Sequence, residues 1–146
     1  MIITKRFSFE ASHILPRHEG KCSRLHGHSW SLSISVEGPI CAETGFVVDY
    51  AKLSRMVERN LIEHLDHSHL GHGLAQCVAK DRYTTFQPYF GTEFYPSSEN
   101  LCRAIFKLLA PLVKELSKDV RLYQVEIDET CTSSACWSRL DEYTNE

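Results

Sequence analysis

Residues 26–36 alternate strictly between two kinds of side chain, and this alternation constrains the fold more than any other feature of the chain. One parity carries His26, His28 and Trp30 followed by three aliphatic residues, and the other carries one glycine and four serines. Strand residues two apart point to the same face of a sheet. The pattern therefore predicts a half-buried β-strand whose inward face begins with two imidazoles.

A second alternating segment precedes this strand. Apolar residues share one parity over residues 3–12, and His13 continues the same parity beyond them. The polar loop 14–24, which contains proline and glycine, joins the two segments. We expect neighbouring strands joined in this way to pair antiparallel, which would bring His13 close to His26 and His28.

Two helices are expected further along the chain. The first should run to about residue 65 with Asp49 as its N-cap, because apolar residues recur at three-and-four spacing. The second should start near 96–99, where a serine cap and an acidic residue favour a helix start, and Pro111 should kink or interrupt it. The connection between them, 71–95, has no clear period and is long for a compact domain.

Two strands complete the predicted elements. Tyr123, Val125, Ile127 and Glu129 share one parity of the first, and the second lies near 136–139. The order β-β-α-α-β-β is typical of an α+β fold with an antiparallel sheet. The length of 146 residues suits one domain, residues 1–146.

Charge and hydropathy limit the possible partners and location. The formal net charge is −3, so the chain lacks the excess of basic residues that would indicate nucleic-acid binding. No apolar run approaches the roughly 18–20 residues that a membrane span needs, and the first residues lack the apolar core of a signal peptide. We therefore expect a cytoplasmic protein without membrane contact, whose six cysteines are reduced rather than paired.

Three histidines at one end of a hairpin are a suitable ligand set for a catalytic metal. Three neutral imidazoles from His13, His26 and His28 would leave one tetrahedral position open for substrate or water. The alternative is that His26 and His28 are ordinary strand residues and His13 an ordinary loop residue. Spacing alone does not decide between these interpretations.

Cys22 lies in the polar loop, four residues before His26 and flanked by Lys21 and Arg24. Nearby cations favour the thiolate form, so Cys22 is a candidate base or nucleophile. The alternative is a buried structural thiol.

A second group of histidines, 64–72, follows the first helix. His64, His67, His69 and His72 could form a metal tract of their own, although His64 falls on the apolar stripe and is more simply explained by packing. Asp66 and His67 would form an acid–base pair if their side chains met, because a carboxylate orients an imidazole and raises its basicity.

Glu129 is the last inward-facing residue of its strand. A carboxylate at the end of an apolar face is costly to bury unless it receives hydrogen-bond donors. A ligand with two parallel N–H groups, such as a pterin, would supply them. The alternative is an exposed glutamate at the end of a strand.

Taken together, these residues resemble the 6-pyruvoyl-tetrahydropterin synthase / 6-carboxy-tetrahydropterin synthase family. The resemblance covers nearly the whole chain and depends on the joint order of six segments: Phe9–His13, Cys22–His28, Thr44–Tyr50, Leu65–His67, Pro96–Glu99 and Glu129–Thr132. It implies the tunnelling fold, in which two helices cover one face of the sheet and subunits close into a barrel. It also implies a homo-oligomer, commonly a hexamer built as a dimer of trimers, with active sites between subunits.

The resemblance implies a role for each candidate residue. His13, His26 and His28 would bind Zn²⁺, and Cys22 would be the catalytic base or nucleophile. Asp66 and His67 would relay protons to the site of an adjacent subunit, and Glu129 would anchor a pterin ring. The remaining substrate contacts would come from Ser97, Ser98, Arg24 and Lys21, with Arg17 as a further cation for the triphosphate.

The three residues between Cys22 and His26 resemble the carboxy-tetrahydropterin synthases of the 7-deazaguanine (queuosine) pathway. The implied reaction converts 7,8-dihydroneopterin triphosphate to 6-carboxy-5,6,7,8-tetrahydropterin with release of acetaldehyde and triphosphate. Two alternatives stay open: a 6-pyruvoyl-tetrahydropterin synthase, and a non-catalytic zinc- or pterin-binding module of the same fold.

Overall fold

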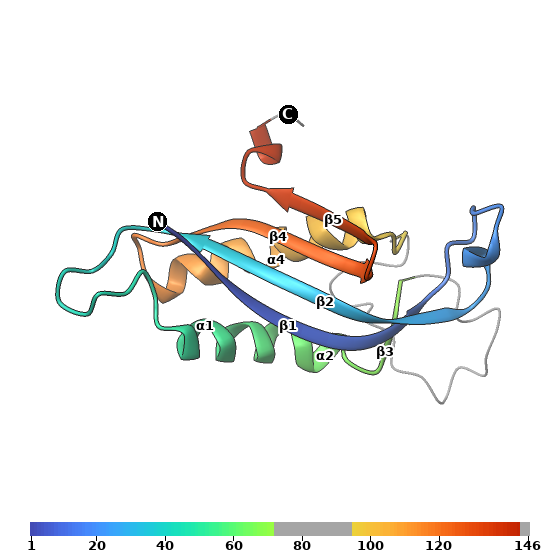
Figure 1. Ribbon diagram of the computed structural model, residues 1–146, viewed down its shortest axis with the longest axis horizontal. Helices are drawn as coiled ribbons and strands as arrows, with labels where there is room; N and C mark the ends of the chain where they lie inside the picture. The colour runs from blue at the N-terminus through green and yellow to red at the C-terminus, as the bar shows by residue number, and fades with distance from the viewer. Residues whose placement is uncertain (72–94, 144–146) are drawn as a thin grey trace.

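The computed structural model describes residues 1–71 and 95–143, which form one curled sheet and two helical segments (Figure 1). The strands are β1 (Ile2–His13), β2 (His26–Glu37), β3 (Ser68–Leu70), β4 (Arg121–Thr130) and β5 (Ser133–Ser138). The helices are α1 (Tyr50–Val57), a π-helical turn (Glu58–Ile62), α2 (Glu63–Leu65) and α4 (Ser98–Leu116), with 3₁₀ turns at Lys21–Ser23 and Asp141–Tyr143. The predicted connection 71–95 lies almost wholly outside the described residues.

The strand order is β3-β1-β2-β4-β5. Strands β1 and β2 form the predicted long antiparallel hairpin, and β2–β4 and β4–β5 are also antiparallel. The short strand β3 was not predicted, and it pairs parallel to the end of β1. The expected order β-β-α-α-β-β is therefore correct except for this additional three-residue strand, which makes the sheet mixed at one edge.

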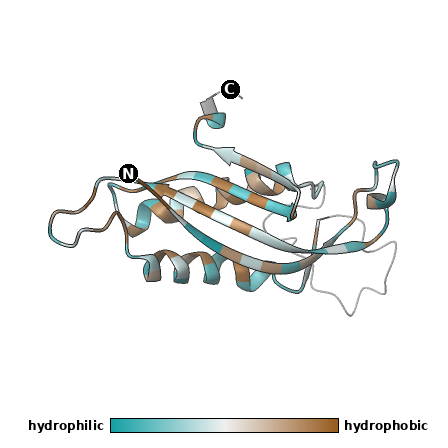
Figure 2. Ribbon diagram, viewed as in Figure 1, coloured by the Kyte–Doolittle hydropathy of each residue, from teal (hydrophilic) through white to brown (hydrophobic). Residues whose placement is uncertain are grey.

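Both helical segments cover the same face of the sheet, where one hydrophobic core forms. Hydrophobic and polar residues alternate along the strands, as Figure 2 shows. The inward residues of β2 are fully buried from Trp30 to Val36, and serines occupy the opposite face. This confirms the half-buried strand that the alternation predicts. No helix in the described part of the chain is long and apolar enough to cross a membrane.

The first helical segment begins at the predicted cap, because the Asp49 carboxylate accepts a hydrogen bond from Ala51 N at 2.8 Å. Its buried residues are four apart throughout, at positions 53, 57, 61 and 65. In an α-helix of 3.6 residues per turn, each step of four overshoots a full turn by about 40°. The wider π-helical turn between α1 and α2 offsets part of this drift and keeps all four side chains toward the sheet.

The second helix, α4, starts at the expected serine: the Ser97 hydroxyl accepts from Asn100 N. Helix α4 continues through Pro111 to Leu116, so the expected interruption is wrong, and the kink that was its alternative stays a prediction. A proline ring costs the helix one backbone hydrogen bond. The buried residues on both sides of Pro111, including Leu109 and Val113, compensate by holding the helix on the sheet.

Two irregularities in β4 change the predicted pattern. Val36 pairs with Leu122 and Ser35 with Gln124, so Tyr123 is an extra residue and Leu122 is buried instead of it. A second register shift, between Asp128 and Thr130, makes Glu129 an extra residue opposite β5. Bulges of this kind redirect a side chain, and the second one bears directly on the candidate site.

Candidate metal centre

The three predicted histidines meet at one end of the β1–β2 hairpin. His13 pairs directly with His26 across the two strands, and His28 lies opposite Ala11. The ring centroids of the three imidazoles lie 4.5–5.1 Å apart. Alternation along the two strands therefore predicted the correct face for all three side chains.

Backbone carbonyls fix the orientation of two of these rings. His13 Nδ1 donates to Pro96 O and His26 Nδ1 donates to Arg24 O, each at 2.8 Å. A carbonyl only accepts, so each ring carries a proton on Nδ1 and, when neutral, a lone pair on Nε2. Hydrogen bonding of the distal nitrogen in this manner is what orients metal-bound histidines.

Burial keeps the histidines in the form that binds metals. Burial lowers the pKa of His13 from 6.5 to about 4, against the opposing effect of its hydrogen bond to Pro96. Burial also lowers the pKa of His28, although the nearby Glu129 carboxylate opposes this shift. Metal ligation requires neutral imidazole, so both shifts favour it.

Glu129 joins the same cluster. Its Oε1 atom lies 3.3 Å from both His13 Nε2 and His28 Nε2. Its side chain is 21% exposed, so the alternative of an exposed strand-end glutamate is not what the structure shows. The proximity of Glu129 to the histidines was not predicted from the sequence.

A bound cation fits this arrangement. His13 Nε2 and His26 Nε2 lie 3.0 Å apart, so two lone pairs face each other beside a carboxylate oxygen. His28 Nε2 is buried and has no hydrogen-bond partner in the described part of the chain. The candidate ligand atoms of the three histidines and Glu129 all lie within 4.8 Å of one another. Electron-rich groups this close together repel one another unless a cation lies between them.

Cys22 lies in the loop that leads into the metal cluster. It is the middle residue of the 3₁₀ turn Lys21–Ser23, and its thiol is half-buried and free. Leu15 N donates to Cys22 O at 2.9 Å, which closes the base of the loop. The turn is followed by Arg24, whose carbonyl accepts a hydrogen bond from His26, so a short continuous segment joins Cys22 to His26 of the metal cluster.

The side chains of Asp66 and His67 meet, which was the condition for the predicted acid–base pair. His67 Nδ1 lies 2.9 Å from Asp66 Oδ2, and both residues are held by Glu10 in β1. Glu10 N donates to Asp66 Oδ1 at 2.8 Å, and His67 N donates to Glu10 O at 2.6 Å. The pKa of the Asp66 carboxyl is lowered, and the largest cause is the hydrogen bond that it accepts from Glu10 N. The His67 side chain is 80% exposed, so its imidazole is available to a second molecule.

The remaining predicted contacts lie around these groups. Ser97 caps α4 directly after Pro96, whose carbonyl holds His13, so the start of α4 adjoins the metal cluster. Ser98 Oγ donates to Glu99 at 3.4 Å. Lys21 and Arg24 are exposed in the loop. Arg17, from the same loop, lies over the Tyr95 ring, 6.0 Å from its centroid.

The second histidine group does not form a metal cluster within the described residues. His64 is exposed, so a role in core packing, expected from its position on the stripe, is wrong. The added π-helical residue rotates this part of the helix relative to the simple stripe. His69 is buried in β3, where its Nδ1 lies 3.0 Å from Ser12 Oγ, and His72 lies outside the described residues.

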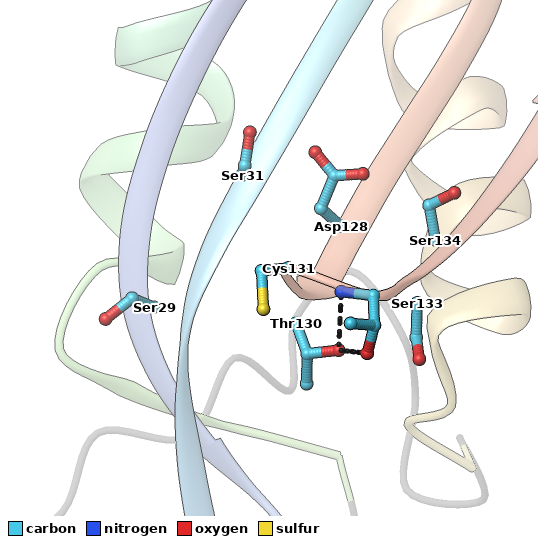
Figure 3. Close-up of a pocket in the computed structure, with 8 residues that line it drawn as sticks. Ser29, Ser31, Asp128, Thr130, Cys131, Ser133 and Ser134 are labelled. Atoms are coloured by element: carbon cyan, nitrogen blue, oxygen red, sulfur yellow. Dashed lines mark hydrogen bonds between the residues drawn. The ribbon is translucent and has the colours of Figure 1, made fainter.

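A cavity of about 580 Å³ opens on the other face of the sheet (Figure 3). Ser29 and Ser31 of β2 and Asp128 of β4 line it, together with the β4–β5 turn, where Thr132 N donates to Thr130 Oγ1. Ser29 and Ser31 have the opposite parity to His28 and Trp30. This polar cavity is therefore separate from the metal cluster.

Known proteins resemble the chain in sequence. The family model described as 6-pyruvoyl tetrahydropterin synthase matches residues 2–139. The chain is 38% identical to a 6-carboxy-5,6,7,8-tetrahydropterin synthase of Synechocystis sp., covering 92% of this chain and 90% of the relative. It is 28% identical to the enzyme of the same name from Haemophilus influenzae, covering 84% and 91%.

Solved structures share the fold. An uncharacterized protein from Wolinella succinogenes superposes with a TM-score of 0.75 at 21% identity, covering 95% of this chain and 98% of that one. The 6-pyruvoyl tetrahydropterin synthase of Caenorhabditis elegans superposes with a TM-score of 0.70 at 22% identity, covering 94% of each chain. The expected α+β fold is therefore confirmed.

Proposed function

The chain belongs to the 6-pyruvoyl tetrahydropterin synthase family, and we propose that it is a zinc-dependent 6-carboxy-5,6,7,8-tetrahydropterin synthase. The proposed reaction converts 7,8-dihydroneopterin triphosphate and one water molecule to 6-carboxy-5,6,7,8-tetrahydropterin, acetaldehyde and triphosphate, as a step of 7-deazaguanine (queuosine) biosynthesis. The observation that carries the proposal is the convergence of three histidine Nε2 atoms beside a carboxylate, with a free thiol in the loop between the two strands that carry the histidines. The relatives that carry this name support the choice of reaction.

His13, His26 and His28 are the proposed zinc ligands. Three imidazoles match the ligand number of catalytic zinc sites, which keep one position open for substrate or water. Zinc bound there would polarise the oxygens of the substrate side chain and acidify its carbon-bound protons. The carbonyls of Pro96 and Arg24 keep two of the ligands in the metal-binding tautomer.

Cys22 is the proposed base that removes a proton from the substrate side chain. It is free and half-buried, in the loop that leads into the proposed zinc ligands. His67, oriented by Asp66, is proposed to return a proton. Its exposure suits a role in the site of an adjacent subunit.

Glu129 is the proposed anchor of the pterin ring. An ionised carboxylate accepts hydrogen bonds from two parallel N–H groups, and one edge of a pterin ring carries two such groups. Its position beside the histidines would place the bound ring next to the metal. Ser97 and Ser98 at the start of α4 are proposed to contact the pterin, and Arg24, Lys21 and Arg17 the triphosphate.

We further propose a homo-oligomer, a hexamer built as a dimer of trimers. Within the described residues, β1 is paired on its outer side only at residues 11–13, and β5 has no outer neighbour. Unpaired edges pair readily with other chains, and closing sheets into a barrel removes them. Free thiols throughout the described residues support a reducing, cytoplasmic location.

Incubation of the purified protein with 7,8-dihydroneopterin triphosphate and mass spectrometry of the products tests the function. Acetaldehyde and a carboxypterin are the expected products. A product that retains the three-carbon side chain would identify a 6-pyruvoyl-tetrahydropterin synthase instead. Binding of zinc or pterin without turnover would indicate a non-catalytic module of the same fold.

A further inference from the structure

Trp30 forms the inner wall of the metal cluster. Its indole is fully buried and contacts two of the proposed ligands edge-on. The centroid distances are 5.1 Å to His13 and 5.2 Å to His28, with interplanar angles of 84° and 76°. One ring therefore supports imidazoles from both strands of the hairpin.

The indole is itself fixed from two directions. Its Nε1 donates to Ala11 O at 3.1 Å, across to the neighbouring strand β1. Its ring stacks on Phe9, with centroids 6.0 Å apart and planes 6° from parallel. Phe9 is the register partner of Trp30, and Ala11 is the partner of His28. The hydrogen bond therefore draws the indole toward the histidine end of the hairpin.

We propose that Trp30 is a positioning residue of the metal centre, whose indole sets the ring orientation of His28 and, together with the Pro96 carbonyl, that of His13. The terminal side-chain torsion of histidine is broad, so a ring without neighbours samples many orientations. The proposal rests on the proposed function, because it assumes that these histidines bind zinc. Groups that orient ligands typically change metal affinity by about 10–100-fold.

A purely structural role in the core is the competing explanation, and the chain offers a matched control. It contains two tryptophans, and the second, Trp137, lies on β5 against other partners. Trp137 Nε1 donates to Glu142 at 2.8 Å, and Arg103 lies 5.3 Å from its ring centroid. Trp30→Phe and Trp137→Phe therefore make the same chemical change at positions that differ in contact with the histidines.

The first experiment measures zinc affinity by competition with a chelator and records the visible absorption spectrum of bound Co²⁺. We expect Trp30→Phe to bind zinc about 10–100-fold more weakly, with an altered Co²⁺ spectrum. Trp137→Phe should match the parent protein in both. Parent-like affinity and spectrum in Trp30→Phe, or equal losses in both variants, would overturn the positioning role.

The second experiment uses tryptophan fluorescence and leaves Trp30 unchanged. In Trp137→Phe, Trp30 is the only tryptophan, so bound Co²⁺ should quench nearly all the emission. Unquenched emission in a Co²⁺-saturated sample would overturn the contact between Trp30 and the metal cluster. A parent protein that binds neither zinc nor Co²⁺ would instead contradict the proposed metal site itself.

If Trp30→Phe does not fold, Phe9→Leu serves as the second variant. It removes the stacking partner of Trp30 without changing the indole or any histidine. We expect a several-fold loss of zinc affinity and a change in the Co²⁺ spectrum. An affinity and a spectrum equal to those of the parent would overturn the proposal.

Discussion

His13 donates a hydrogen bond from Nδ1 to the carbonyl oxygen of Pro96, a residue 83 positions further along the chain. This contact joins the end of the β1–β2 hairpin to the start of α4. It also fixes the tautomer of His13, so that Nε2 points to His26 and Glu129 as an acceptor. The geometry of the metal cluster therefore depends on how the second helix docks on the sheet.

The histidines should be required for metal binding. His28→Ala removes a proposed ligand, and we expect zinc affinity to fall by at least about 100-fold, beyond the usual effect of residues that only orient ligands. His64→Ala is the matched control, because His64 is exposed and outside the cluster. Elemental analysis and chelator competition measure both variants. Full zinc content in His28→Ala would exclude His28 as a ligand.

Cys22 should be required for turnover and not for the metal. We expect Cys22→Ala to abolish product formation while its zinc content stays near that of the parent, because the three histidines are the proposed ligands and Cys22 is not one of them. Cys41→Ala, which removes an exposed thiol outside the cluster, should keep its activity. Loss of zinc from Cys22→Ala would make Cys22 a ligand instead of the base.

Glu129 should be required for binding of the pterin. We expect Glu129→Ala to lose most of its affinity for a dihydropterin, measured by calorimetry, with a circular dichroism spectrum like that of the parent. Each charge-assisted hydrogen bond contributes about 1.5–3 kcal/mol, so losing two predicts a weakening of at least about 100-fold. Unchanged pterin binding combined with reduced zinc affinity would assign Glu129 as a fourth ligand.

The Asp66 carboxyl should titrate below the usual pKa of an aspartate even when His67 is absent. The largest cause of the lowered pKa is the hydrogen bond from Glu10 N, which His67→Ala leaves in place. Carboxyl ¹³C NMR titration measures this value in the parent and the variant. A return to the ordinary value in His67→Ala would make the imidazole the main cause.

The same shift has a consequence for folding. A carboxyl whose pKa is lower in the folded state stabilises the protein above its unfolded pKa. This contribution is lost as the pH falls through the folded pKa. Asp66→Asn should therefore reduce the dependence of stability on pH in the acidic range, measured by urea unfolding at several pH values.

Much of the site follows from alternation along two strands. Side chains two apart share a face, so His13, His26 and His28 had to leave the hairpin on the side where the core lies. These predictions depend only on local backbone geometry and were confirmed. Alternation gave Glu129 the inward parity of its strand, but its proximity to the histidines was not predicted, and a bulge at that residue changes its pairing with β5.

Other parts of the site have no signal in the sequence. The partners of His13, His26 and Asp66 are backbone groups of Pro96, Arg24 and Glu10, and every residue carries such groups whatever its side chain. Strand β3 has three residues, too few to show a period. The predicted interruption of α4 at Pro111 is wrong because the burial of residues on both sides of the proline outweighs the preference of proline against helix interiors.

The sequence by itself thus determined the fold class, the hairpin, and which side chains share the buried face with the imidazoles. Only the tertiary structure decided that Asp66 and His67 meet, that Glu129 lies 3.3 Å from two histidines, and that Trp30 supports both strands of the cluster. The physical reason is the range of the interactions involved. Parity acts between residues two apart, whereas these distances depend on how strands and helices far apart in the chain pack together.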